Sequence, residues 1–401
     1  MFFQGRLERL LQQLKSSAAI PLRLELWNGR AFDLSPNPKV RITLPEPSAL
    51  RYLLAFDLLR LGEAYVEGRI GVEGPILDVF GVGEQLARAG APRKRLRGAS
   101  KTWRHSRERD REAIHQHYDG ADDFYALWLD ANRVYSCAYF KDGSEDLDTA
   151  QEQKLDHILR KLMLKRGERL LDIGCGWGAL ILRAAERYGA HATGITLSES
   201  QHEYASRRIR DAGLQGQCEV RLLDYRDLAG EGVYDKIVSV GMFEHVGLKN
   251  LLFYFDRIRA LLKDGGLALN HGITSTDPDS RWVGLGVGEF IDRYVFPFGE
   301  LPHLSLALRE LSKAGLEAAD IECLRWHYAK TCAIWVTRLE QHREQAIALA
   351  GEKRYRIWEL YLAGCAHGFD NGWISVYQIL ACKAGQARSI PLPRTRDYMY
   401  Q

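Results

Sequence analysis

The sequence predicts an α/β fold, with a doubly wound, Rossmann-like sheet in the larger domain and a small α+β domain before it. From about residue 150 onward, apolar strand-like runs alternate with amphipathic helical stretches, the pattern of a sheet built from strand–helix units. Before residue 92, short alternating segments are followed by apolar runs of helical period. The 401 residues are 46% hydrophobic and 27% charged. This is enough for two or three cores, and it excludes collagen, coiled-coil and disordered chains.

Charge and cysteine usage exclude further classes of protein. The formal net charge is only +3, so nucleic acid is not expected as the main partner. No apolar run approaches the ~18 residues of a membrane-spanning helix, and the charged N-terminal stretch does not have the pattern of a secretory signal. The seven cysteines form no C-x-x-C pair. We therefore expect neither a disulfide framework nor a metal site, and a cytoplasmic location.

The N-terminal part predicts a domain over residues 1–92. Its strands are expected at LRLELW (22–27) and VRITL (40–44), and its helices around 49–59 and 76–89. An earlier helix is predicted to have one apolar face, formed by Phe3, Leu7, Leu10, Leu11 and Leu14. That face indicates packing on the domain or on a subunit partner, with docking on a membrane surface as the alternative.

A basic linker is predicted over residues 93–114. Residues 93–111 hold nine Lys or Arg against two acids, and Pro92 precedes them. One interpretation is a solvated connection between domains; the other is a patch that docks on anionic lipid.

The larger domain is predicted over residues 115–401, with an insertion or lid at about 275–305, where Gly, Pro and aromatic residues break the pattern. Two long helices and a last strand follow the lid. The first five expected strands lie within 168–178, 191–198, 218–224, 234–242 and 267–274, and helices are expected at 179–189, 201–213, 248–263, 331–350 and 353–369.

The strongest local signal is a glycine loop, Asp172-Ile173-Gly174-Cys175-Gly176-Trp177-Gly178, which follows a strand and precedes a helix. Glycines allow the backbone to turn tightly and to approach a ligand that a Cβ would block. The spacing differs from the dinucleotide pattern G-x-G-x-x-G. It resembles the fingerprint of S-adenosylmethionine-dependent methyltransferases, in which the acid, here Asp172, serves the methionine ammonium. A structural glycine turn without a cofactor is the alternative.

The remaining cofactor contacts are expected at the ends of the next two strands. After the second strand, the chain Thr196-Leu197-Ser198 lacks the usual acid, so Gln201 and the Leu197 backbone are predicted to surround the ribose. Asp224 and Tyr225, after the third strand, are predicted to hold the adenine.

Six motifs in order extend the resemblance: Y-S-C-A-Y-F (135–140), L-D-I-G-C-G-W-G (171–178), D-Y-R-D-L (224–228), S-V-G-M-F-E-H-V-G (239–247), F-I-D-R-Y-V-F-P (290–297) and H-Y-A-K-T (327–331). Together they resemble the cyclopropane-fatty-acyl-phospholipid synthase family, which includes the mycolic acid cyclopropane synthases. The likeness runs from about residue 115 to the C-terminus. L-G-E-A-Y-V-E-G (61–68) is similar to the N-terminal, lipid-associated domain of bacterial members.

The resemblance implies a class I methyltransferase fold and a specific reaction. A methylene from S-adenosylmethionine is added to the cis double bond of unsaturated acyl chains in membrane phospholipids. The cyclopropane forms through a carbocation that bound bicarbonate deprotonates. A homodimer, peripheral at the inner membrane face, is expected.

The resemblance also implies particular site residues. Bicarbonate-holding positions of the family match Cys137, Glu244, His271, Ile273 and Tyr328, and cofactor positions match Tyr135 and Ser136. Glu244 follows the fourth expected strand, His271 ends the fifth and Tyr328 follows a sixth, so all three are expected on the carboxyl edge where open α/β sheets bind ligands. Cys365 matches a cysteine to which a nucleophilic role has been attributed, although this chemistry needs no thiol.

Other interpretations stay open at this point. Glu244 could cap a helix, Cys137 could be an ordinary buried residue, His271 could simply end a strand, and Tyr328 could belong to the core. An enzyme forming methyl-branched or methylene fatty acids, a lipid-binding protein with a vestigial methyltransferase fold, and a small-molecule methyltransferase are the competing functions.

Overall fold

A computed structural model describes residues 11–12, 15, 20–55, 58–90, 122–280, 287–296, 299–385 and 392–400. The chain forms two compact units. The first comprises Met1–Ala99, Trp282–Val295 and Cys332–Asn371, and the second comprises Ser100–Arg281, Phe296–Thr331 and Gly372–Gln401. The predicted basic linker and most of the apolar face predicted for the N-terminal helix lie outside the described residues, except for Leu11, which is buried.

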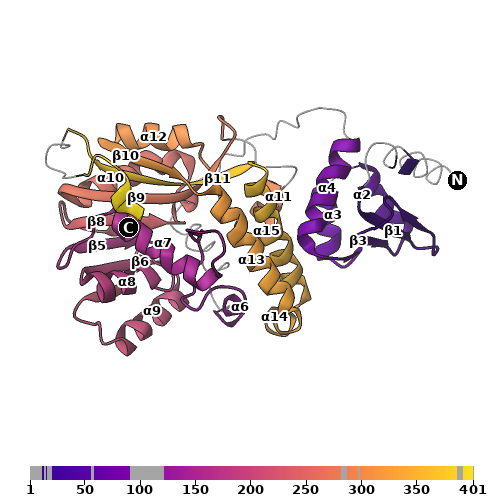
Figure 1. Cartoon of the computed structure of the whole chain (residues 1–401), viewed down its shortest axis with the longest axis horizontal. Helices are drawn as coiled ribbons and strands as arrows, with labels where there is room; N and C mark the ends of the chain where they lie inside the picture. Colours follow the sequence, from indigo (N-terminus) through magenta and orange to yellow (C-terminus); the bar gives the residue numbers. More distant parts are fainter. Residues whose placement is uncertain are drawn as a thin grey trace. The chain divides into compact units, whose positions relative to one another are not determined.

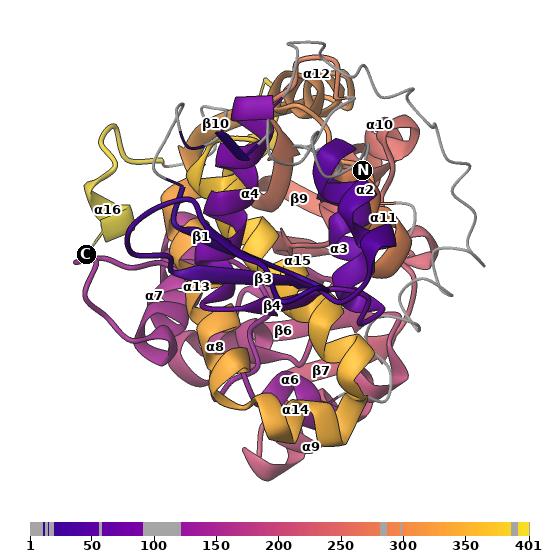
Figure 2. The same cartoon turned by 90° about the vertical axis from the view of Figure 1, so that its right-hand side faces the viewer.

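The first unit contains a four-stranded sheet in the order β2-β1-β3-β4. The strands are β1 (Leu22–Leu26), β2 (Ala31–Asp33), β3 (Val40–Leu44) and β4 (Gly71–Glu73). In β1 and β3 every second residue is buried, which confirms the alternation read from the sequence. Figure 2 shows β1, β3 and β4 side by side, in indigo.

Helices from distant parts of the chain complete this unit. They are α2 (Leu50–Ala55), α3 (Leu58–Val66), α4 (Ile76–Gly90), α11 (Val287–Tyr294), α14 (Arg343–Ala350) and α15 (Glu352–Asp370). α15 packs against α3, α4 and α11. The helices from the second half of the chain therefore group with the N-terminal elements. The sequence instead predicts that all of residues 115–401 belong to the larger domain.

The second unit is built on a seven-stranded mixed sheet in the order β10-β11-β9-β8-β5-β6-β7. Its strands are β5 (Arg169–Ile173), β6 (His191–Thr196), β7 (Cys218–Leu222), β8 (Tyr234–Val240), β9 (Leu262–Ser275), β10 (Leu316–Cys323) and β11 (Ile374–Lys383). β5 to β9 pair in parallel, as predicted. β11 is antiparallel to both β9 and β10. This confirms the predicted class I methyltransferase fold.

Helices cover both faces of this sheet, as Figure 1 shows. One face carries α7 (Leu147–Lys161), α8 (Ala179–Tyr188) and α9 (Glu199–Asp211), and the other carries α10 (Leu251–Leu261) and α12 (Leu304–Lys313). Each face has its own apolar core. The remaining helices are α6 (Asp122–Ala126), α13 (Arg325–Gln341) and α16 (Asp397–Tyr400). No helix in the described part of the chain combines the length and hydrophobicity needed to cross a bilayer.

Candidate functional site

The glycine loop joins β5 to α8, and each of its three glycines has a positive φ. A Cβ on Gly174 would lie 2.9 Å from the Met242 Cβ, and one on Gly178 would lie 2.9 Å from the Ala205 Cβ. Those two glycines allow close packing. A Cβ on Gly176 would meet no atom within 4 Å, because this residue borders a cavity.

The cavity lies at the carboxyl ends of β5, β6, β7 and β8, where an open α/β sheet binds its ligand. It is lined by eleven of the twelve residues predicted to bind the cofactor: Tyr135, Ser136, Asp172, Gly174, Cys175, Gly176, Thr196, Leu197, Gln201, Asp224 and Tyr225. Gly178 does not line it. Instead, Gly178 precedes α8 as its N-cap residue.

Asp172 is the charged group at the floor of this cavity. Its side chain is buried, and its Oδ1 has no hydrogen-bond partner among the residues that the structure describes. Burial raises the pKa of Asp172 to about 7, although the nearby Lys154 ammonium opposes the shift. An unsatisfied buried carboxylate needs a donor or a cation. The ammonium of a methionine moiety would supply both, so this residue fits S-adenosylmethionine.

The chain after β6 places polar groups at the next strand end. The Ser198 hydroxyl accepts a hydrogen bond from the Gln201 backbone N–H at 3.3 Å and caps α9. The Thr196 hydroxyl donates to Gln201 Oε1 at 2.8 Å. With its oxygen engaged, the Gln201 amide retains its NH2 group as a donor, as a ribose hydroxyl requires.

Asp224 and Tyr225 follow β7. The Asp224 carboxylate accepts from the Arg226 backbone N–H at 2.9 Å and pairs with the Arg226 guanidinium at 2.6 Å. The Tyr225 ring packs edge-on against Tyr254, with centroids 5.6 Å apart. Both residues are therefore fixed before any ligand arrives.

A second group of predicted residues, which includes Glu244, does not line this cavity. The short helix after β8 carries Glu244, whose Oε1 accepts a hydrogen bond from the Ile273 backbone N–H of β9 at 2.6 Å. The carboxylate thus bonds to the neighbouring strand, and it caps neither its own helix nor α10. Its Oε2 is buried, and no described residue bonds to it. Burial raises the pKa of Glu244 to about 7.

His271 lies two residues before Ile273 on β9, opposite Gln378 on β11. The Gln378 amide NH2 donates to His271 Nδ1 at 3.2 Å. An amide NH2 can only donate, so the ring carries its proton on Nε2. That Nε2 is buried and has no hydrogen-bond partner in the described part of the chain. Burial lowers the pKa of His271 well below its usual value, so the ring stays neutral. A small acceptor, such as one oxygen of bicarbonate, fits this N–H.

Cys137 and Tyr328 meet at one carbonyl group. The Cys137 thiol donates to the Leu324 carbonyl at 3.7 Å, and the Tyr328 backbone N–H donates to the same oxygen at 3.0 Å. Burial strongly raises the pKa of Cys137, so the thiol stays protonated. The described structure thus joins Glu244 to Ile273 by a direct hydrogen bond, whereas Cys137 and Tyr328 are linked only through the Leu324 carbonyl to which both donate.

Cys365 lies on α15 in the first compact unit, whereas the other five predicted catalytic residues lie in the second. It is buried, and burial raises the pKa of its thiol to about 12. A nucleophilic cysteine needs a thiolate, which this environment disfavours.

Three site residues were not predicted from the sequence: Gln151 and Lys154 on α7, and Gln378. The Gln151 amide donates to the Val134 carbonyl at 3.2 Å and to the Ser136 carbonyl at 2.9 Å. The Lys154 ammonium donates to the Ser136 hydroxyl at 2.7 Å and lines the cavity. Gln151 and Lys154 lie three positions apart in a stretch of helical period that also carries His157 and Lys161, and these polar residues among apolar ones were the sequence signal for this wall.

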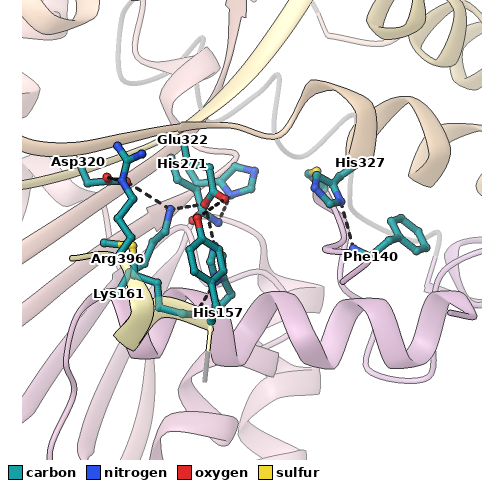
Figure 3. A network of polar contacts seen from close by, with 12 residues as sticks. Phe140, His157, Lys161, His271, Asp320, Glu322, His327 and Arg396 are labelled. Carbon is teal, nitrogen blue, oxygen red and sulfur yellow. Dashed lines mark hydrogen bonds and ion pairs between the residues drawn. The ribbon is translucent and has the colours of Figure 1, made fainter. Parts of the chain in front are cut away.

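A polar network continues along the same helix (Figure 3). Glu322 on β10 accepts from His157 Nε2 at 2.7 Å and from the Lys161 ammonium. Burial opposes ionisation of Glu322, but His157 and Lys161 outweigh it and lower its pKa to about 2. The Tyr139 ring stacks on His157, with centroids 4.3 Å apart, and on His327, at 4.8 Å. The network therefore braces the segment that carries Cys137.

Comparison with known proteins agrees with this geometry. The family model for mycolic acid cyclopropane synthetase matches residues 105–379, and a domain family of unknown function matches residues 10–88. A probable fatty acid methyltransferase of Pseudomonas putida is 47% identical over 392 residues, which is 96% of this chain and 98% of the relative. The tuberculostearic acid methyltransferase UfaA1 of Mycobacterium tuberculosis is 34% identical, over 94% of this chain and 91% of its own.

Solved structures give the same result. The mycolic acid cyclopropane synthase CmaA1 complexed with SAH and CTAB superimposes with a TM-score of 0.64 and 35% identity, covering 68% of this chain and 97% of its own. With the glycine loop, the cavity and the mixed sheet in place, the chain belongs to the mycolic acid cyclopropane synthetase family and has the class I S-adenosylmethionine methyltransferase fold.

Proposed function

We propose that the protein transfers a one-carbon unit from S-adenosylmethionine to the cis double bond of an unsaturated phospholipid acyl chain, and that the product is a cyclopropane fatty acid. One observation carries the proposal. Beside a glycine-loop cavity, Glu244 Oε2 and the His271 Nε2–H are both buried without partners among the described residues. A proton released by methylation of nitrogen or oxygen can pass to water, whereas the loss of a proton from carbon calls for a base held against it, which such a polar pocket can bind.

The residues fit two bound groups. When bound, S-adenosylmethionine supplies an electrophilic methyl group, and bicarbonate supplies a base that is a poor target for alkylation. Asp172 and Gln201 would hold the first group, and Glu244 and His271 would hold the second. The chain contributes orientation and the exclusion of water, because these polar atoms are buried.

The balance of the reaction favours ring closure. The sulfonium C–S bond breaks and a C–C bond forms at the alkene, which leaves a carbocation on the acyl chain. Loss of one methyl proton to the base closes the ring, so the lipid gains CH2 and no reductant is required. A saturated methyl branch would need a hydride donor in addition.

A second product class has its own support. The relatives named probable fatty acid methyltransferase and tuberculostearic acid methyltransferase align over almost the whole chain. Their names favour a methyl-branched or methylene fatty acid. The methylene or methyl-branched alkene forms when the carbocation loses a proton without ring closure, and later reduction of that alkene gives a saturated methyl branch.

The substrate also implies a location. Acyl double bonds lie inside the bilayer, so we propose that the enzyme docks on the membrane surface, with the basic residues 93–111 as the attracting segment. We further propose that it acts as a homodimer.

Purified protein, vesicles of monounsaturated phospholipid and S-adenosylmethionine with a CD3 group would test the proposal without any reductant. A cyclopropane retains two deuterium atoms and has no olefinic proton by NMR. A methylene product also retains two deuterium atoms but keeps an olefinic group, and a methyl-branched alkene retains three. Absence of any labelled lipid would contradict both candidates.

A further inference from the structure

Two opposite charges line the cofactor cavity without pairing with each other. Lys154 comes from α7 and Asp172 from β5, and their side chains are almost fully buried. Among the described residues, no carboxylate oxygen lies within 4 Å of the Lys154 ammonium. Its one hydrogen-bond partner is the neutral Ser136 hydroxyl, at 2.7 Å, and Asp172 Oδ1 has none.

Such an arrangement is costly in the absence of a ligand. A buried ion normally finds a counter-ion and satisfies all its hydrogen bonds, because desolvation is otherwise uncompensated. Burial lowers the pKa of Lys154 to about 8 and raises that of Asp172 to about 7. The charge of each group opposes the pKa shift that burial causes in the other. Both groups are thus held close enough to interact, but too far apart to bond.

The unused hydrogen-bond donors of Lys154 and the unused acceptor of Asp172 are complementary to opposite charges. An ammonium has three N–H donors, and the Ser136 hydroxyl takes one of those of Lys154. Besides burial, three groups influence the pKa of Lys154: the Cys137 thiol, Asp130 and Asp172. The Cys137 thiol stays protonated, so it provides no negative charge to pair with the ammonium. Two N–H donors therefore remain for an anion, and Asp172 Oδ1 remains for a cation.

We infer that Lys154 and Asp172 form a receptor for an α-amino acid zwitterion, in which Lys154 binds the carboxylate and Asp172 binds the ammonium of the methionine part of the cofactor. The inference rests on the proposed function for the identity of the cofactor. It assigns Lys154, a residue outside the glycine loop, to ligand binding. It also gives a reason for the buried lysine that packing alone does not give.

The test compares ligands that differ only at the amino acid end. S-adenosylhomocysteine carries the zwitterion, its decarboxylated analogue carries only the ammonium, and 5′-methylthioadenosine carries neither. For Lys154→Met we expect the Kd of S-adenosylhomocysteine to rise roughly 10- to 100-fold, as expected when a charge-assisted hydrogen bond is lost. For the decarboxylated analogue and 5′-methylthioadenosine, the Kd measured by calorimetry should be the same for the variant as for the parent.

Lys161→Met is the matched control. Lys161 is equally buried on the same helix, but it pairs with Glu322 and does not line the cavity. This variant should weaken the three ligands equally or not at all. Thermal melts of both variants report whether they fold.

The outcomes are separable. If Lys154→Met weakens all three ligands equally, the lysine only supports the cavity and the inference is wrong. If it weakens none, the carboxylate lies elsewhere. Should the variant fail to fold, the parent alone still decides, because equal affinity for S-adenosylhomocysteine and its decarboxylated analogue would contradict the inference. If the parent binds none of the three, the proposed cofactor itself is wrong.

Discussion

At the scale of single residues, the site depends on a few polar atoms that the fold buries and leaves unsatisfied. Glu244 Oε2, His271 Nε2 and Asp172 Oδ1 share this property. In Glu244 and His271 the other polar atom is fixed by a hydrogen bond, so the unsatisfied atom is held in place. Since such atoms are costly in a folded protein, they indicate where ligand atoms are expected.

Glu244 allows a prediction about both turnover and pH. Glu244→Gln should lower turnover at least ~100-fold and change the Kd of S-adenosylhomocysteine less than ~3-fold, because the residue does not line the cofactor cavity. A parallel loss of cofactor affinity would instead assign Glu244 to the cofactor pocket. Glu310→Gln is the control, because Glu310 on α12 is a comparably buried carboxylate that pairs with Lys313 away from the site.

The pH dependence follows from the raised pKa of Glu244. Its folded-state pKa of about 7 exceeds the ordinary 4.5, so the folded state binds the proton more tightly. The free energy of unfolding should therefore fall as the pH rises from about 4.5 through 7. Glu244→Gln should remove part of this fall, about 1–3 kcal/mol, in urea titrations at pH 5 and 7. Identical pH dependence in the two proteins would contradict the prediction.

Gln378 is predicted to position His271. Nitrogen-15 NMR of the parent should show the neutral tautomer protonated at Nε2, since Nδ1 accepts from the Gln378 amide. Gln378→Leu removes the hydrogen bond that fixes this tautomer, so both neutral tautomers should be populated. We expect kcat to fall roughly 10-fold, with the KM for the cofactor unchanged. Gln153→Leu, at a half-buried position on α7, should alter neither the spectrum nor kcat. A parent His271 protonated at Nδ1 would refute the assignment.

At the scale of secondary-structure elements, helix α7 does more than cover the sheet. Gln151 and Lys154 bond to the chain around Ser136, and His157 and Lys161 bond to Glu322 of β10. These four polar side chains are all almost fully buried. The helix therefore forms one wall of the cavity and also braces the segment before it.

The glycine loop gives a prediction at this scale. Gly176→Val should abolish binding of S-adenosylmethionine and keep the fold, because its side chain would project toward open space at the cavity. Gly213→Val is a matched control: Gly213 also has a positive φ and open space around a Cβ, but it does not line the cavity. Both variants should lose about 1–2 kcal/mol of stability from backbone strain, and only the first should lose the ligand in calorimetry.

At the scale of the whole molecule, the chain combines two compact units. The second unit has the methyltransferase fold, and the first unit takes its helices from the N-terminal part and from the second half of the sequence. The basic residues 93–111, which lie outside the described residues, connect the N-terminal elements to the larger sheet in the sequence. Anionic lipid head groups attract such a segment, which is why the proposed function assigns it to docking.

The basic segment is predicted to act in docking. Changing Arg93, Lys94, Arg95 and Arg97 together to Ser should reduce activity on anionic vesicles and leave activity on detergent-dispersed lipid unchanged. Binding of the parent to vesicles should weaken with salt, because screening shortens the range of the attraction. If the variant sediments with vesicles as well as the parent at low salt, the segment is only a linker.

The sequence by itself determined the glycine loop, the alternation of β5 to β9 with helices, and the position of Glu244 after β8. These features depend on local turn chemistry and on hydrophobic period, which a single chain displays directly. His271 was expected to end its strand, but β9 continues to Ser275. The sequence did not reveal the antiparallel direction of β11, the grouping of α15 with the N-terminal helices, or the roles of Lys154 and Gln378. Those depend on which distant segments pack together, and a buried polar side chain shows its partner only once its neighbours from other elements are in place. The polar atoms left without a partner were likewise decided by the tertiary structure alone.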